Sequence, residues 1–251
     1  MTDLHHIVQV PLAPLREGPS DRAEQVSQLH AGECCRIIGQ GEKDWVEVEL
    51  EADGYRGWCD VKQLLKVDGF RVESSSLIQS PISVWLEEDG ASLILPAGSR
   101  VQSNTSGNWF LAGRPLTPAT DLDVCFHPFS SPLEAALNFM GSPYAWGGKS
   151  VLGMDCSGLT QLAYLLCGRR LPRDASQQVL EGEHVEWNHR QVGDLAFFAN
   201  ENGSITHVGI LVSPNEIIHA SGHVRRDVLT SEGILRDNLL THATSELRRV
   251  Y

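Results

Sequence analysis

The first part of the chain alternates between apolar and polar residues in short runs, which is the pattern of β-strands. Turn-forming clusters separate these runs, and no helical period of useful length interrupts them. The runs lie at 7–10, 35–38, 45–50 and 55–59, and the turns at 16–20, 31–33 and 52–54. We therefore expect residues 1–67 to form a small all-β barrel or sandwich.

A weaker copy of the same pattern follows at a shift of about 65 residues. Leu29-His30-Ala31-Gly32 recurs as Leu95-Pro96-Ala97-Gly98, and Asp44-Trp45 recurs as Asn108-Trp109. Gly57-Trp58 of the first copy has no counterpart in the second. An internal repeat indicates a second domain of the same fold, so we place a divergent copy at residues 68–126.

Apolar residues at the spacing of an α-helix occur only in the last part of the chain, after residue 127. Residues 131–134 (Ser-Pro-Leu-Glu) combine an N-cap serine, a proline at the first helical position and a glutamate three residues after the cap. That helix is expected to end at Gly141, a second helix covers 157–167, and a third begins within 171–178. Strand-like runs at 195–198 and 208–212 come afterwards. Residues 127–251 are therefore expected to form an α+β domain.

Charge and cysteine content limit the partners that the chain is expected to have. Of 251 residues, 32 are acidic and 20 are basic, which gives a net charge of −12. Such a chain is not expected to bind nucleic acid or an anionic membrane, and no stretch reaches the ~18 apolar residues of a membrane span. Residues 1–8 lack the basic and apolar regions of a secretory signal. The six cysteines form no C-x-x-C pair, so we expect reduced thiols and a cytoplasmic location, with export as the alternative. We also expect a monomer.

One cysteine lies where a nucleophile is expected. In Asp155-Cys156-Ser157-Gly158, a glycine-rich turn leads Cys156 to the start of the predicted helix at 157–167. Unpaired backbone N–H groups and the positive end of the helix dipole lower a thiol pKa from about 8.5 toward ~4–7. Cys156 is therefore a candidate thiolate nucleophile, and the alternative is a buried cysteine that only packs.

Two histidines on predicted strands complete a possible triad. His207 lies within the run 205–212, and His219 lies within the run 217–222. A cysteine nucleophile needs an imidazole that takes its proton and a third polar group that orients the imidazole. Cys156, His207 and His219 can fill these roles in chain order, although either histidine alone is also compatible with a core position.

Four short blocks carry a family resemblance. They are Pro143-Tyr144-Ala145-Trp146-Gly147-Gly148, Asp155-Cys156-Ser157-Gly158, His207-Val208-Gly209-Ile210 and His219-Ala220-Ser221-Gly222. Their order and spacing over residues 130–251 resemble the NlpC family of bacterial cell-wall cysteine peptidases, which implies a papain-like fold for the α+β domain. The repeat ahead of it resembles bacterial SH3-like domains. In such peptidases these domains often bind cell-wall polymer. The alternative is that they are structural spacers that form one side of the active-site cleft.

The resemblance also implies roles for individual residues. Tyr144 resembles the side chain that, with the backbone N–H of Cys156, stabilises the oxyanion; its alternative is a packed turn tyrosine. Asp155 resembles the aspartate that binds the free N-terminal ammonium of a stem peptide, and its alternative is a helix N-cap. Tyr55 matches a position that closes over the N-terminal alanine. We further expect Ser157 to hold polar groups of the substrate, and Arg173 either to meet the α-carboxylate of a γ-linked glutamate or to be a surface charge.

Three functions remain open from the sequence. The favoured one is a peptidase that cuts the γ-D-glutamyl–diamino acid bond of the free murein peptide L-Ala-γ-D-Glu-diamino acid, for cell-wall recycling. The alternatives are an exported endopeptidase that acts on intact murein, and a non-catalytic wall- or peptide-binding protein. No metal or cofactor is expected, because the remaining histidines have no metal-ligand spacing. Whether the diamino acid is diaminopimelate or lysine is left open.

Overall fold

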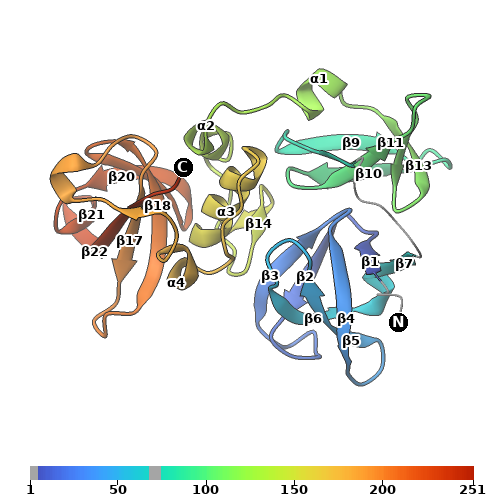
Figure 1. The fold of residues 1–251 in the computed structure, drawn as a ribbon, viewed down its shortest axis with the longest axis horizontal. Helices are drawn as coiled ribbons and strands as arrows, with labels where there is room; N and C mark the ends of the chain where they lie inside the picture. The colour runs from blue at the N-terminus through green and yellow to red at the C-terminus, as the bar shows by residue number, and fades with distance from the viewer. Residues whose placement is uncertain (1–4, 68–74) are drawn as a thin grey trace. The chain divides into compact units, whose positions relative to one another are not determined.

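The computed structural model describes residues 5–67 and 75–251 and divides the chain into two compact units (Figure 1). Unit 1 holds residues 1–128 together with 146–151, and unit 2 holds residues 129–145 and 152–251. The predicted boundary at residue 68 and the first residues searched for a secretory signal lie outside the described residues, so the domain bounds stay predictions. Within the described ranges, no helix is both long and apolar enough to cross a membrane.

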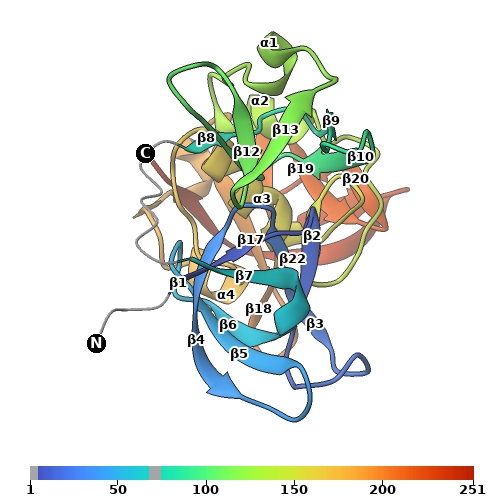
Figure 2. The ribbon, with the colours of Figure 1, turned by 90° about the vertical axis from the view of Figure 1, so that its right-hand side faces the viewer.

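Unit 1 begins with a seven-stranded antiparallel β-barrel. In this sheet the strand order is β3-β2-β6-β5-β4-β1-β7, and Figure 2 shows β4, β5 and β6 running side by side. Burial alternates along β2 and β5, as the sequence pattern predicted, and Val46, Val48 and Leu50 of β5 enter the core. The strands are β1 (His5–Val8), β2 (Leu12–Arg16), β3 (Gln25–His30), β4 (Cys34–Gln40), β5 (Trp45–Leu50), β6 (Arg56–Asp60) and β7 (Leu64–Val67), and a 3₁₀ turn, Val61–Gln63, precedes β7.

A second, six-stranded sheet follows in unit 1, in the order β10-β9-β13-β12-β11-β8. Its core is built on fully buried Trp85, with Trp109 stacked on Phe126 at 5.0 Å between ring centroids. Ile7 and Ala31 of the first barrel belong to the same apolar cluster, so the two sheets share part of one core. The elements are β8 (Ser75–Leu77), β9 (Ile82–Leu86), β10 (Ser92–Pro96), β11 (Arg100–Ser103), β12 (Trp109–Leu111), β13 (Arg114–Pro118) and α1 (Leu122–Cys125).

Residues 146–151 leave unit 2 and pack within unit 1, against strand β3. The Trp146 indole N–H donates to the Glu24 carboxylate at 2.5 Å, and the Gln25 amide donates to the Trp146 carbonyl at 3.0 Å. Gly147 has a φ of +72°, and a Cβ there would lie 2.3 Å from the Gln25 carbonyl oxygen. Glycine is therefore required at this position both by the left-handed backbone and by the close approach of β3.

A buried polar cluster fixes the end of the same segment. Lys149 pairs with Glu33, with 3.6 Å between Nζ and Oε1, and both side chains are buried. His30 is fully buried; its Nε2 lies 3.0 Å from the Lys149 carbonyl oxygen, and its backbone N–H donates to Glu33 Oε2 at 2.8 Å. Burial alone would raise the pKa of Glu33, but the charge of Lys149 and the neighbouring His30 outweigh it, so this pKa is lowered. Removing one partner of such a pair strands a buried charge, which typically costs about 3–5 kcal/mol.

The cluster predicts an acid-sensitive stability. Burial, aided by the Lys149 charge, lowers the pKa of His30 to about 4, whereas an unfolded histidine titrates near ~6.5. Between these values the unfolded chain binds more protons than the folded one, so stability falls as the pH falls through this window. His30 alone is expected to contribute a loss of up to about 3 kcal/mol.

The test compares the wild type with His30→Gln by chemical unfolding at pH 6.5 and at pH 4. The difference in unfolding free energy between the two proteins should change by this amount between the two pH values, with the wild type losing more. A difference that stays constant with pH would contradict the assignment.

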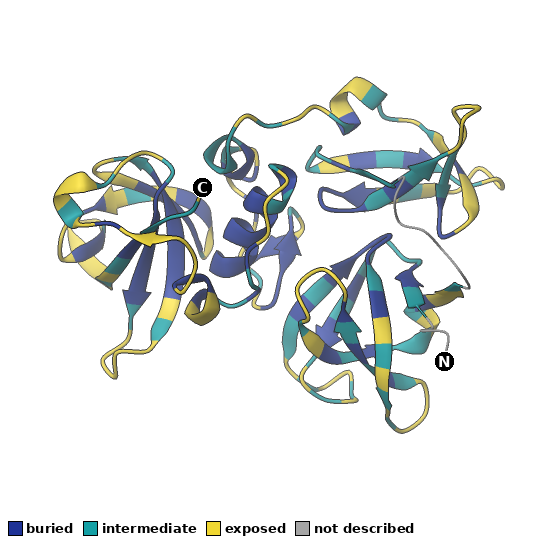
Figure 3. Ribbon diagram, in the orientation of Figure 1, coloured by how far each residue is buried: buried dark blue, intermediate teal, exposed yellow. Residues whose placement is uncertain are grey.

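Unit 2 combines short helices with a seven-stranded antiparallel sheet in the order β16-β22-β17-β18-β19-β20-β21, and β22 also pairs with β21. Figure 3 shows that α3 and the centres of β17 and β18 are almost entirely buried. The helices are α2 (Pro132–Leu137), α3 (Cys156–Leu166) and α4 (Ala175–Gln178), with a 3₁₀ turn at Trp187–His189. The strands are β16 (Glu183–His184), β17 (Leu195–Ala199), β18 (Ile205–Ser213), β19 (Glu216–Ser221), β20 (His223–Leu229), β21 (Gly233–Arg236) and β22 (Leu239–Arg249), with the two-residue strand β15 (Gly153–Met154) ahead of α3. The two-residue strand β14 (Lys149–Ser150) belongs to the segment 146–151 of unit 1.

The predicted α+β order, helices first and sheet afterwards, is confirmed, with one correction of length. Ser131 caps α2 through a bond from the Glu134 N–H, as expected. The helix ends at Leu137 and not at Gly141, and residues 138–141 form turns instead of a further helical turn. The Gly141 N–H donates instead to the Val224 carbonyl of β20 at 2.8 Å, which ties this turn to the sheet.

Candidate active site

Cys156 lies at the N-terminus of a helix, as the sequence predicted, and it is the first residue of α3, one position before the predicted start at residue 157. Asp155 is the N-cap in an extended conformation, and its carboxylate accepts the Gly158 N–H at 2.7 Å. The Cys156 side chain is 7% exposed, and the backbone N–H groups of Val208 and Ser157 face its sulfur. The nucleophile candidate is therefore held between a helix N-terminus and strand β18.

The protonation state of this cysteine differs from the sequence expectation. Burial, and then the charge of Asp155, raises the pKa of Cys156 to about 12, although the two backbone N–H groups and Arg173 act in the lowering direction. Burial also holds the pKa of His207 well below its usual value, with nearby His219, His242 and Arg225 adding to the effect. The helix dipole is thus outweighed by desolvation, and burial favours the neutral form of both the Cys156 thiol and the His207 imidazole.

Three adjacent strands align the histidines into one chain of hydrogen bonds. His207 on β18 lies 2.7 Å from His219 on β19 (Nε2 to Nδ1), and His219 lies 2.9 Å from Asp227 on β20 (Nε2 to Oδ2). Arg225 donates from Nε to the same oxygen of Asp227 at 2.8 Å. Burial lowers the pKa of His219 to about 4 despite its bond to Asp227, so this ring is neutral near pH 7.

This chain of bonds fixes the tautomers. The ionised carboxylate of Asp227 only accepts, so Nε2 of neutral His219 carries its proton and Nδ1 of the same ring must accept. His207 therefore donates from Nε2, which leaves Nδ1 of His207 with a free lone pair. A base with one unprotonated nitrogen is what proton abstraction from a thiol requires.

Sequence reasoning missed Asp227 and Arg225. The signal that could have located them is strand register: β20 follows β19 through a hairpin, and His219 pairs directly with Arg225. Asp227 stands two residues further on, so its side chain points to the same face as that of Arg225. Without the position of the hairpin turn, that register could not be assigned.

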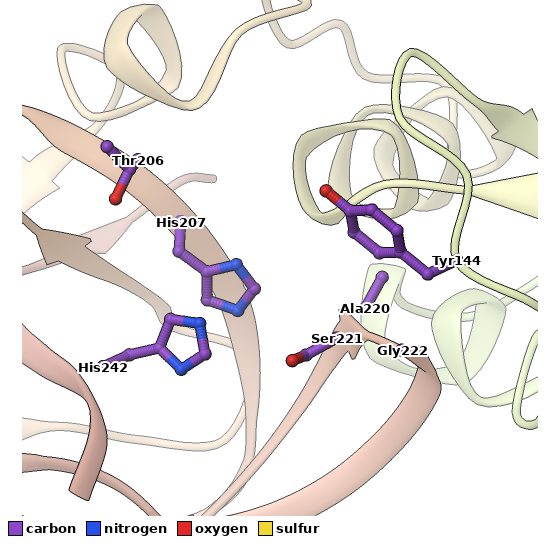
Figure 4. Close-up of a pocket in the computed structure, with 7 residues that line it drawn as sticks. All are labelled: Tyr144, Thr206, His207, Ala220, Ser221, Gly222 and His242. Atoms are coloured by element: carbon purple, nitrogen blue, oxygen red, sulfur yellow. The ribbon is translucent and has the colours of Figure 1, made fainter.

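Tyr144 lines a pocket of about 340 Å³ together with His207 (Figure 4). Its backbone N–H donates to the Gly222 carbonyl at 3.1 Å, and it bridges to Met154 just ahead of α3. Burial, and then the neighbouring Cys156 and Asp155, raises the pKa of Tyr144 to about 12, so the phenol remains a proton donor. The remaining residues of the pocket wall are Thr206, Ala220, Ser221, Gly222 and His242.

Arg173 corrects the interpretation of the residues beside the nucleophile. It is 2% exposed and is not a surface charge; it donates to Asp155 at 3.1 Å and 2.6 Å, from Nη1 to Oδ1 and from Nη2 to Oδ2. Arg173 Nη1 also donates to Ser157 Oγ at 2.8 Å. The Asp155 charge is therefore balanced within the protein, and the guanidinium of Arg173 is engaged by Asp155. Substrate binding by Asp155, Ser157 and Arg173 stays a prediction.

Tyr55 lies in unit 1, where its ring packs against the core of the first barrel and its backbone N–H donates to Asp53 Oδ1 at 3.0 Å. Its predicted contact with the substrate stays a prediction. Across residues 5–67 and 75–251, no group of three or more His, Cys, Asp or Glu side chains is arranged to hold a metal ion.

Two family models match this chain. Residues 141–243, which hold the cysteine and both histidines, match the NlpC/P60 family, and residues 15–64 match the bacterial dipeptidyl-peptidase Sh3 domain. The chain is 30% identical over 251 aligned residues to dipeptidyl-peptidase 6 of Lysinibacillus sphaericus, covering 87% of this chain and 88% of that relative. The chain belongs to the NlpC/P60 family. It is a cysteine peptidase, and the predicted order of an SH3-like barrel before an α+β peptidase domain is confirmed.

Two further comparisons define how far the likeness extends. The chain is 29% identical over 214 residues to a gamma-D-glutamyl-L-lysine dipeptidyl-peptidase of Bacillus cereus (strain ATCC 10987 / NRS 248), covering 70% of this chain and only 62% of that relative. The crystal structure of an NlpC/P60 family protein from Bacillus cereus ATCC 10987 has the same fold, with a TM-score of 0.78 at 21% identity, covering 98% of this chain and 99% of that one. The SH3 match stops at residue 64, so a second SH3-like domain at 68–126 stays a prediction.

The neutral resting thiol of the NlpC/P60 chain predicts how Cys156 reacts with an alkylating agent. Because burial raises the pKa of this thiol, its rate of alkylation by iodoacetamide should climb continuously from pH 6 to pH 9. Peptide mass spectrometry would follow the modification at Cys156, with Cys156→Ala as the blank. A rate that is already constant between pH 5 and 7 would indicate a thiolate–imidazolium pair and would overturn the neutral assignment.

The tautomer argument predicts the effect of Asp227→Asn. An asparagine amide can donate to His219 Nε2, which would move the proton to Nδ1 of His219 and then to Nδ1 of His207, the wrong nitrogen. We expect kcat to fall by about 10²–10⁴-fold with little change in KM, and Asp227→Glu, which keeps a carboxylate, to retain more activity. Equal losses in the two variants would show that the carboxylate acts only through packing.

Proposed function

We propose that this peptidase hydrolyses the γ-D-glutamyl–L-diamino acid bond of free murein peptides that begin with L-Ala, and so releases L-Ala-D-Glu for recycling. The observation that carries the proposal is the similarity across nearly the whole chain to a relative named as a dipeptidyl-peptidase. The separate match of the barrel to a dipeptidyl-peptidase SH3 domain supports the same substrate class. All six cysteines are unpaired thiols, which is compatible with a reducing compartment, so we place the reaction in the cytoplasm.

The geometry supports a thioester mechanism. The Cys156 sulfur attacks the γ-carbonyl carbon of D-glutamate while its proton passes to Nδ1 of His207, and Tyr144 with the Cys156 backbone N–H donates to the oxyanion. The C–N bond then breaks, and the diamino acid leaves with the proton from His207. Water hydrolyses the thioester by the same route in reverse, which frees the thiol and the L-Ala-D-Glu product.

The Asp155–Arg173 pair determines how strongly the proposed enzyme should prefer a substrate with a free amino terminus. A substrate ammonium at Asp155 would join a carboxylate that Arg173 already balances, so a peptide without that ammonium strands no buried charge. What such a peptide loses is one charge-assisted hydrogen bond, worth about 1.5–3 kcal/mol. That corresponds to roughly a 10- to 150-fold preference for the free amino terminus, since ~1.4 kcal/mol is tenfold.

The experiment compares L-Ala-γ-D-Glu-L-Lys with its N-acetylated form and with intact sacculi. Mass spectrometry follows the amino group that hydrolysis exposes on the diamino acid, because the L-Ala-D-Glu half stays acetylated in the second substrate and bound to glycan in the third. The free tripeptide should have a kcat/KM at least about tenfold higher than the acetylated one. Cys156→Ala is the catalytic blank, and the diaminopimelate tripeptide in parallel reports the diamino acid preference. Equal kcat/KM for both peptides, or cleavage of the same bond in sacculi at a comparable rate, would favour an endopeptidase of intact murein.

A further inference from the structure

A third histidine packs on the predicted base. His242 of β22 lies face to face with His207, with 4.2 Å between ring centroids and 26° between the planes. The same ring meets His219 edge-on at 5.8 Å. Figure 4 shows His207 and His242 side by side on one wall of the pocket, across from Tyr144. His242 carries no part of the hydrogen-bonded chain to Asp227, so its contact with the base needs a separate account.

Sheet register brings His242 to this position. Strand β17 lies between β18 and β22, and Phe198 of β17 pairs with His207 on one side and Thr244 on the other. The last pair of β17 and β22 is Ala199 with Ala243, so His242 lies just past the end of β17. His242 is two residues from Thr244 and so projects from the same face of the sheet as Phe198 and His207, where the Phe198 ring contacts both histidines and the two imidazoles stack.

We propose that His242 is a positioning residue for His207: its neutral ring holds the plane of the base by stacking, and its protonation sets the acid limit of the reaction. The inference rests on the proposed function only for the substrate used in the assay. Acylation turns His207 into an imidazolium, and a neutral aromatic face at 4.2 Å stabilises that cation whereas a second cation opposes it.

Phe198 of the neighbouring strand β17 meets the His242 ring edge-on at 6.0 Å, and the titratable groups near His242 come from β18, β19 and β20. They are His207 of β18, His219 of β19, and Arg225 and Asp227 of β20, while its own neighbour Thr241 lies 2.9 Å from Nδ1. Burial, with Arg225 adding and Asp227 opposing, lowers the pKa of His242, so the ring is neutral at pH 7 and gains its proton only in acid. Once His242 is protonated, its positive charge disfavours the His207 imidazolium, and turnover falls.

The experiment separates ring packing from charge with two substitutions, His242→Phe and His242→Ala, assayed on the free tripeptide from pH 5 to 9. Phenylalanine keeps an aromatic face and cannot be protonated, so at pH 8 its kcat should exceed that of the alanine variant by about threefold or more. The acid limb of kcat for His242→Phe should move to lower pH by about half a unit or more. KM should change less than kcat in both variants. His184→Phe, at an exposed histidine of β16, is the matched control and should keep the wild-type profile.

A second measurement needs no peptide substrate: alkylation of Cys156 at pH 5.5 and pH 8. His242→Phe should be alkylated about threefold faster than wild type at pH 5.5, because His207 is then free of a neighbouring cation when it takes the thiol proton. If wild type fails to cut the tripeptide, the proposed substrate is wrong, and the alkylation profiles still test His242. Wild-type pH profiles in both variants, or a rise in KM with kcat unchanged, would overturn the positioning role.

Discussion

The buried ion pair of Asp155 and Arg173 is the interaction on which the peptidase unit depends. One carboxylate caps α3 through Gly158, binds both terminal nitrogens of Arg173 and stands directly before Cys156. Loss of either partner would leave an unpaired buried charge, at a typical cost of about 3–5 kcal/mol. The Asp155–Arg173 pair thus fixes the start of α3 and the position of the Cys156 sulfur. Arg173 lies just before α4, so this pair joins the two helices.

This pair also governs the electrostatics of the nucleophile. Asp155 raises the pKa of Cys156, while Arg173 lowers it, and burial exceeds both. Desolvation favours the neutral forms of the thiol and of the imidazole, and at Cys156 it outweighs the two backbone N–H groups that face the sulfur. Charge then develops only when the substrate carbonyl is attacked and Tyr144 and backbone N–H groups can stabilise the oxyanion.

Local sequence signals predicted what depends on neighbours along the chain. The Ser131 cap, the start of α3 at Cys156 and the alternating strands of the first barrel follow from residues within a few positions of each other. The partners of Arg173, the role of Asp227 and the stacking of His242 depend on strand register and on burial, which no local pattern specifies. The prediction of a lowered pKa for the Cys156 thiol was wrong for the same reason. The position of Cys156 at a helix N-terminus can be predicted from the sequence, but its desolvation depends on how the whole domain packs.

The segment 146–151 extends this argument to the first unit. It belongs with the barrel, yet it is bonded to Ala145, next to Tyr144, at one end and to Leu152, four residues before Cys156, at the other. The buried Lys149–Glu33 pair, the fully buried His30 and the tight contact at Gly147 give this segment one conformation within unit 1. The conformation of residues 146–151 is therefore set by contacts within unit 1, although the residues before and after them in the chain belong to unit 2.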